Sequence, residues 1–298
     1  MTVFSRAVPC IALALLALPS GCKKDSSSSK QTFTISAIPD QDPEKLQRLY
    51  GAVATYLSKE LGVPVAYRPV TDYTASVTAF KVGELDMVWY GGLTGVQARI
   101  QVPGAHAIAQ RDIDEQFHSV FIVNKSSDIQ DLAGLKGHTF TFGSESSTSG
   151  RLMPQFFLDK AGVKLDDFKG KHGFSGSHDK TIKLVAAGAY EAGALNEQVW
   201  KTYVKNSAPE LDQVRLIWTS PAYHDYHWVL HPAAAKRYGA DFADKVRAAL
   251  LKLDASNPEH KAVLDLFGAT RFIPTDDANY GQIEAVGRQI GMIVDTAR

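Results

Sequence analysis

Short apolar runs alternate with longer segments of helical periodicity in the first third of the chain. Strands are predicted at 33–38 (FTISAI), 65–70 (VAYRPV) and 85–92 (LDMVWYGG). A helix is predicted over 42–62, where Asp-Pro and Gly suit the two ends, and a second helix begins after Asp72. This β-α-β-α-β order predicts an α/β fold with a mainly parallel sheet covered by helices.

The alternation restarts further along the chain. The predicted elements are strands at 117–125 and 138–142, helices from about Ser149 to Leu158 and over 178–187, strand character within 214–230, and then helices to the end. We therefore expect two lobes, 32–122 plus 220–298 and 123–219, with a ligand cleft between them. Ligands of such sheets bind beyond the carboxyl ends of the strands.

The N-terminus has the pattern of a secretory signal. Arg6 precedes an apolar run over 7–18, and small residues then lead to Cys22. Residues 18–22 resemble the lipobox of bacterial lipoproteins, with Pro19 where Leu is usual. We expect removal of residues 1–21, lipidation of Cys22 and a serine-rich flexible tether to residue 31. The protein would then lie in the bacterial periplasm or on the outer cell envelope, held at the membrane by its lipid anchor.

Composition excludes several functions. Cys10 and Cys22 are the only cysteines, so the folded part has none for a disulfide, a thiolate nucleophile or a sulfur-ligated metal. The 32 basic residues equal the 32 acidic ones and form no block, which disfavours a nucleic-acid partner.

The segment 142–150, FGSESSTSG, is the main candidate for a binding site. Its polar residues Ser146, Ser147, Thr148 and Ser149 stand at a predicted helix start, where N–H groups are unpaired and the helix dipole is positive. This predicts a site for a tetrahedral oxyanion; a solvated loop with a serine N-cap is the alternative. Neither a Gly-Lys-Ser/Thr phosphate loop nor a Gly-x-Ser-x-Gly elbow is present.

A second candidate is His178, at the start of the helix predicted over 178–187. There a ring nitrogen can donate to an anion, although a capping or surface histidine fits the pattern equally well.

Four motifs in order resemble those of the periplasmic substrate-binding proteins of phosphonate, phosphite and phosphate ABC importers. They are Thr71-Asp72-Tyr73, Trp89-Tyr90-Gly91, Ser147-Thr148-Ser149-Gly150, and His178 with the segment 187–194. The resemblance extends from Phe33 to about Leu230 and is weaker in the tail.

The resemblance implies a type II two-lobed clamp with no catalytic group, cofactor or metal. It would capture a small oxyanion by hinge closure and deliver it, as a monomer, to an ABC permease in the membrane. The hydroxyls of residues 147–149 would hold the anion, with Tyr73, Tyr90 and His178 closing over it and Trp89 left in the core. The remaining candidates are Gly91, Ser146, Asn196, Glu197 and Tyr223.

The sequence leaves the anion open. Some segments, such as 140–155, resemble those of a subgroup commonly labelled as selenate binders. An anion that keeps a proton favours a carboxylate acceptor, whereas selenate or sulfate would be repelled by one. Asn196 occupies the position that often carries an acid, so Glu197 is the candidate acceptor. The loop 219–228 departs from the Pro-rich form of phosphonate binders, which argues against a long aminoalkyl phosphonate.

Two other functions remain as alternatives. His224 and His227, with Asp225, could ligate zinc in a metal-binding importer component. A hydrolase using Ser, His and Asp is the other, although no nucleophile elbow supports it.

Overall fold

The computed structural model describes residues 1–2 and 31–294, and the chain divides into the units 1–30 and 31–298. The predicted signal peptide, Cys22 and most of the tether lie outside the described residues. Within the described part of the second unit, no helix is both long and apolar enough to cross a bilayer.

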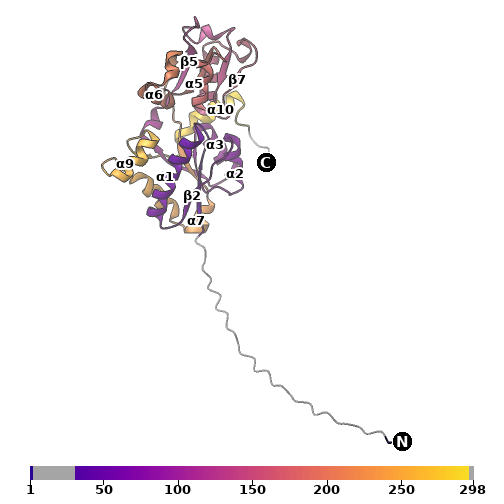
Figure 1. Ribbon diagram of the computed structural model, residues 1–298, viewed down its shortest axis with the longest axis vertical. Coiled ribbons are helices and arrows are strands. Elements are labelled where there is room, and N and C mark those ends of the chain that lie inside the picture. The colour runs from indigo at the N-terminus through magenta and orange to yellow at the C-terminus, as the bar shows by residue number, and fades with distance from the viewer. Residues whose placement is uncertain (3–30, 295–298) are drawn as a thin grey trace. The chain divides into compact units, whose positions relative to one another are not determined.

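The first sheet has six strands in the order β11-β4-β10-β3-β1-β2. Figure 1 shows its strand β2 beside α1. Only β1 with β2 and β1 with β3 pair in parallel; β10 and β11 enter antiparallel. The sheet is therefore mixed, and the expected parallel order holds only for its β-α-β-α-β part. Its strands are β1 (Phe33–Ala37), β2 (Val65–Tyr67), β3 (Met87–Tyr90), β4 (His106–Arg111), β10 (His227–Leu230) and β11 (Phe272–Pro274).

The first helix begins and ends where the sequence predicts, and the second begins after Asp72 as predicted. Asp42 accepts from the N–H groups of Glu44 and Lys45 at the start of α1, and Gly62 ends it with a φ of 66°. The helices are α1 (Pro43–Leu61), α2 (Tyr73–Lys81), α3 (Gly92–Gln101), α7 (Ala233–Tyr238), α8 (Phe242–Leu251), α9 (Pro258–Phe267) and α10 (Gly281–Ile290), with the 3₁₀ turns η1 (Asp112–Gln116) and η6 (Asp277–Tyr280).

The second sheet has five strands in the order β7-β6-β8-β5-β9. Its elements are β5 (Ser119–Asn124), β6 (Phe140–Phe142), β7 (Gly173–Phe174), β8 (Ala192–Asn196), β9 (Val214–Thr219), α4 (Met153–Lys160), α5 (His178–Ala186), α6 (Glu197–Lys205), the π-helical turn η3 (Thr148–Leu152), and the 3₁₀ turns η2 (Ala133–Leu135), η4 (Leu165–Asp167) and η5 (Pro209–Asp212). All of β5 pairs within this sheet. The predicted boundary after residue 122 therefore falls within β5.

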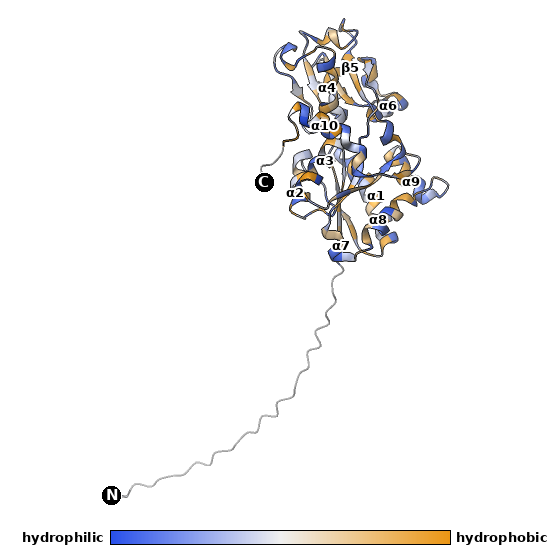
Figure 2. Cartoon of the chain, turned by 180° about the vertical axis from the view of Figure 1, so that it is seen from behind, coloured by the Kyte–Doolittle hydropathy of each residue, from blue (hydrophilic) through white to orange (hydrophobic). Residues whose placement is uncertain are grey.

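Both faces of the second sheet are buried. Along β5, Phe121 and Val123 join one apolar cluster and Val120 and Ile122 join another, as the two-residue period of a strand requires. Figure 2 shows β5 as hydrophobic while α6 carries both kinds of residue. A single larger cluster surrounds the first sheet and extends to Met153 of α4. The two sheets thus position the ends of α3, η3 and β10 next to one another.

Candidate functional site

The segment 146–149 begins the helix that the sequence predicts. Ser147 is its N-cap, and the Ser147 Oγ accepts from the Gly150 N–H at 2.9 Å. The first N–H groups of a helix have no partner inside the helix, so those of Thr148 and Ser149 are available to an anion. Ser147, Thr148 and Ser149 are all buried.

Hydrogen bonds join this helix start to the start of α3 and to the loop before β10. The Leu93 N–H donates to the Thr148 Oγ1 at 2.9 Å, and the Gly92 N–H donates to the Asp225 Oδ1 at 2.8 Å. A Cβ on Gly91 would lie 3.0 Å from the Thr148 Oγ1 and 3.2 Å from the Asp225 Oδ1. Gly91 is therefore a point of close approach between the two sheets' elements.

Asp225 supplies the carboxylate of this cluster. It is fully buried, and its Oδ2 has no hydrogen-bond partner in the described part of the chain. Burial raises the pKa of Asp225 to about 7, although the Gly92 N–H and the Thr148 and Ser149 hydroxyls favour the charged form. At neutral pH this group is therefore poised to share a proton.

Tyr73 brings a second unpaired polar atom to the same place. Its side chain is buried, and its hydroxyl has no hydrogen-bond partner among the described residues. Burial raises the pKa of Tyr73 well above its usual value, and the nearby Ser147 hydroxyl offsets part of that rise. Because an unpaired buried hydroxyl is costly, Tyr73 is suited to donate to a bound group.

His178 is a neutral donor. Burial alone lowers its pKa to about 3. The Asn196 N–H donates to Nδ1 at 3.2 Å, which places the ring proton on Nε2. A histidine with this pKa is a poor general base, so the cluster does not support the hydrolase alternative.

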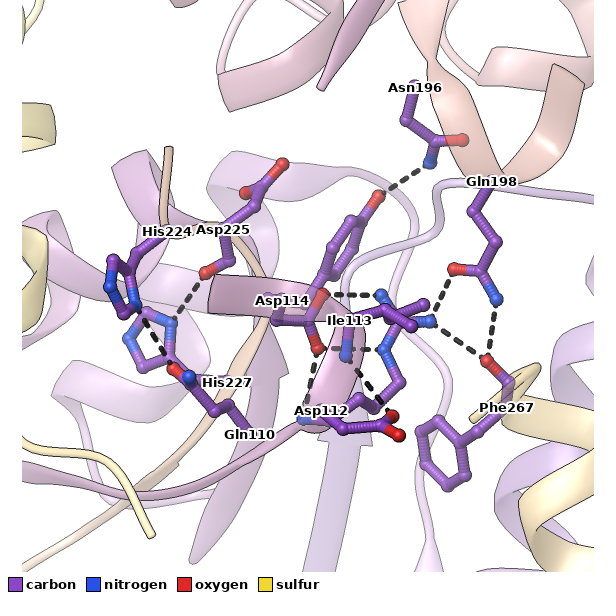
Figure 3. Close-up of polar contacts among 12 residues, drawn as sticks. Gln110, Asp112, Ile113, Asp114, Asn196, Gln198, His224, Asp225, His227 and Phe267 are labelled. Atoms are coloured by element: carbon purple, nitrogen blue, oxygen red, sulfur yellow. Dashed lines mark hydrogen bonds and ion pairs between the residues drawn. The ribbon is translucent and has the colours of Figure 1, made fainter. Parts of the chain in front are cut away.

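Tyr226 and Asp40 complete the cluster, and sequence reasoning missed both. The Tyr226 hydroxyl donates to the Asp40 Oδ2 at 2.8 Å, accepts from the Asn196 Nδ2 at 3.0 Å, and lies 3.4 Å from the His178 Nε2. Figure 3 shows the contact of Asn196 with this hydroxyl. Burial raises the pKa of Asp40 to about 6. The His178 N–H also donates to the Asp40 carbonyl at 3.0 Å.

Tyr223 lies beside the hydroxyl run as expected. It is buried, and its hydroxyl is 2.7 Å from the Ser119 Oγ. The Ser149 hydroxyl is also close enough to lower the pKa of Tyr223, although burial raises that pKa well above its usual value overall.

The expected orientation of the Trp89-Tyr90 pair is reversed. The Tyr90 hydroxyl donates to the Ser76 carbonyl at 2.9 Å, and its ring packs edge-on against Phe80. Tyr90 therefore faces α2. Trp89 instead stacks on Tyr226, with ring centroids 5.9 Å apart. Adjacent strand residues point to opposite faces. Because both faces of β3 are buried, the apolar sequence of this strand could not show which of the two rings faces the cluster.

Two other predicted residues lie outside the cluster. The Glu197 carboxylate pairs with the Lys201 ammonium at 2.9 Å, one turn along α6. The Glu197 carboxylate is therefore engaged within α6, whereas the Asp225 carboxylate lies within the cluster. Ser146 is only half-buried and lines a separate hollow with Arg151.

The histidines of the metal alternative are engaged elsewhere. Both ring nitrogens of His227 are used, since Nε2 accepts from the Arg99 Nη1 at 2.6 Å and Nδ1 donates to the Asp225 carbonyl at 3.0 Å. His224 Nδ1 faces the Gln110 side chain at 3.5 Å (Figure 3). Within residues 1–2 and 31–294, no group of three or more His, Cys, Asp or Glu residues could hold a metal ion.

The two buried acids make stability depend on pH. The pKa of Asp225, about 7, and that of Asp40, about 6, both exceed the 3.8 of an ordinary aspartate. The folded chain thus holds protons that the unfolded chain releases, and its stability should fall as pH rises from about 4 to 7. Asp225→Asn should be more stable than the unaltered protein at pH 8, by on the order of 4 kcal/mol, and nearly equal to it at pH 4.

Urea unfolding of ligand-free protein at both pH values measures this difference. Asp128→Asn is the control, because the Asp128 side chain is 94% exposed. A stability difference for Asp225→Asn that is the same at both pH values would contradict the assignment.

Comparisons with known proteins bear on the family of the chain. The chain is 48% identical over 273 residues to a probable ABC transporter phosphite binding protein, PhnD1, of Prochlorococcus marinus, covering 89% of this chain and 92% of that one. A solved structure of PhnD1 in complex with methylphosphonate matches with a TM-score of 0.85, over 88% of this chain and 99% of that chain. The phosphonates-binding periplasmic protein of Escherichia coli is 28% identical over 85% of this chain and 75% of its own length.

A family model describes the periplasmic substrate-binding proteins of phosphonate ABC transporters, and it matches residues 35–280. These relatives are binding components of transporters and not enzymes, and they share the α/β fold of the periplasmic binding proteins. The chain therefore belongs to the phosphonate family of periplasmic substrate-binding proteins of ABC transporters.

Proposed function

We propose that this protein captures a small tetrahedral oxyanion that keeps one proton, such as phosphite or methylphosphonate, and delivers it to an ABC permease. The observation that carries the proposal is the unpaired Oδ2 of Asp225, buried beside the hydroxyls of Thr148 and Ser149. The names of the PhnD1 relative and of its methylphosphonate complex support the choice of ligand.

The donors and the acceptor suit such an anion. Hydroxyls of residues 147–149, the Tyr73 hydroxyl and the neutral His178 Nε2–H would donate to its oxygens. The Asp225 carboxylate would accept its proton. Sulfate and selenate carry no proton at neutral pH, so the same carboxylate would repel them. The hypothesis of a selenate ligand therefore has less physical support than the hypothesis of a phosphite ligand.

We further propose that the two sheets are the cores of two lobes that close over the anion. The chain passes between them at Phe117 and again at Tyr223, and these two residues form an isolated β-bridge. The Leu93–Thr148 hydrogen bond joins elements of the two sheets, and so does the contact of His178 with Asp40. A bound anion that touches elements of both sheets would add to these contacts and shift the population further toward the closed form.

Attachment to the membrane is a separate part of the proposal. The protein would be lipidated at Cys22 and would act as a monomer. Mass spectrometry of protein extracted from membranes would show an N-terminal diacylated cysteine; a mature chain that begins elsewhere would contradict the anchor.

Asp225→Asn should reverse the preference among anions. Removing the negative charge takes away the proton acceptor and the repulsion together. We expect phosphite affinity to fall at least about tenfold, and sulfate or selenate affinity to rise, in calorimetric titrations at about pH 6.5, where part of the phosphite still carries its proton.

Glu197→Gln is the matched control, because Glu197 is an acid nearby that pairs with Lys201. It should leave both affinities unchanged. Loss of phosphite binding in Glu197→Gln but not in Asp225→Asn would show that the wrong carboxylate has been assigned.

Gly91→Ala tests closure. The added Cβ would meet Thr148 and Asp225 at 3.0 and 3.2 Å, closer than such contacts usually allow. The methyl group should hold the lobes apart and weaken phosphite binding by about tenfold or more, with little loss of thermal stability.

Gly51→Ala serves as its control, since no atom lies within 4 Å of the added Cβ. Calorimetry gives the affinities, and small-angle scattering with and without phosphite reports the closure. Wild-type affinity and compaction in Gly91→Ala would refute the close approach.

A further inference from the structure

A cavity of about 150 Å³ lies next to the anion site. Its walls come from both sheets' elements, since Asp40 and Trp89 belong to the first and Gln198 and Thr202 to the second. Neither the hydroxyl run of 147–149 nor His178 lines it. The cavity is thus a compartment distinct from the anion site.

Tyr226 lies between the two compartments. Its hydroxyl approaches the His178 Nε2 at 3.4 Å on one side, while the residue lines the cavity on the other. Asp40 and Asn196 hold that hydroxyl in place at 2.8 and 3.0 Å. These three residues, Tyr226, Asp40 and Asn196, form a hydrogen-bonded partition.

The partition is rigidly packed. The Tyr226 ring stacks on Trp89 with an interplanar angle of 14° and meets the edge of Phe117. The Arg111 guanidinium lies 5.0 Å from the centre of the Tyr226 ring. A side chain fixed by so many neighbours cannot turn aside at low cost to admit a longer ligand.

The cavity is chemically suited to an ammonium group. Without Tyr226, the Asp40 carboxylate would lose its hydroxyl donor and face the cavity as an unpaired acceptor. Arg111 also lines the cavity, but its charge is paired with Asp114 through contacts of 2.7 and 2.6 Å. Lys45 is the remaining cation on the wall, and Asp265 is a second acid.

We propose that the Tyr226 partition sets the maximum length of the group attached to phosphorus, and that the cavity behind it is a latent compartment for an aminoalkyl chain. This inference rests on the proposed function. It makes Tyr226 a specificity-determining residue that restricts the protein to ligands with a hydrogen or methyl substituent.

Tyr226→Ala tests the partition directly, with Tyr226→Phe as the matched control that keeps the ring. Calorimetric titrations would use phosphite, methylphosphonate, propylphosphonate and 3-aminopropylphosphonate. The unaltered protein should bind methylphosphonate at least about 100-fold more tightly than propylphosphonate. Tyr226→Ala should gain about tenfold or more for 3-aminopropylphosphonate, and more than for propylphosphonate, whereas Tyr226→Phe should keep the original order.

Three outcomes would overturn the inference. The first is a Tyr226→Ala protein that binds phosphite but gains no affinity for 3-aminopropylphosphonate. The second is an unaltered protein that binds methyl- and propylphosphonate equally well, a measurement that decides the matter even if Tyr226→Ala does not fold. The third is an unaltered protein that binds neither phosphite nor methylphosphonate, which would contradict the proposed function as well.

Discussion

The desolvation of the Asp225 carboxylate is the constraint on which the rest of the site depends. A buried carboxylate is stable only if donors surround it, or if it takes up a proton. The Gly92 N–H satisfies one oxygen at 2.8 Å, and the hydroxyls of Thr148 and Ser149 favour its charged form. These donors come from elements of both sheets, so the same carboxylate that would recognise the anion also draws the two halves of the molecule together.

The neutral character of the other groups follows from the same burial. His178 cannot carry charge with a pKa of about 3, and Tyr73 and Tyr223 remain protonated. A dry site of neutral donors would strengthen each hydrogen bond to an anion, because no water competes for it. With the Asp225 carboxylate beside these donors, total charge would be the basis of selection: an anion that brings a proton would be accepted, and a fully ionised anion would be repelled.

Local signals in the sequence predicted much of this arrangement. Helix starts have strong chemical signatures, and the serine and threonine run at 147–149 and the position of His178 were found in this way. Asp225 and Tyr226 were missed as site residues because they lie in a loop and approach the helix start only through tertiary packing. Glu197 was the candidate acceptor because it directly follows Asn196, but in the first turn of α6 it pairs with Lys201. The boundary between the two sheets lies before β5 because β5 pairs with strands of the second sheet. A hydrophobic run in the sequence does not specify such strand pairing.

The central claim is that a buried carboxylate selects an oxyanion by its proton. The most direct test is calorimetry of the unaltered mature protein with phosphite, methylphosphonate, sulfate and selenate, side by side at one pH and one ionic strength. The account predicts tight, one-to-one binding of phosphite and methylphosphonate, with sulfate and selenate weaker by at least about 100-fold. Equal or tighter binding of selenate or sulfate would contradict it, because Asp225 could not then face the anion as a charged acceptor.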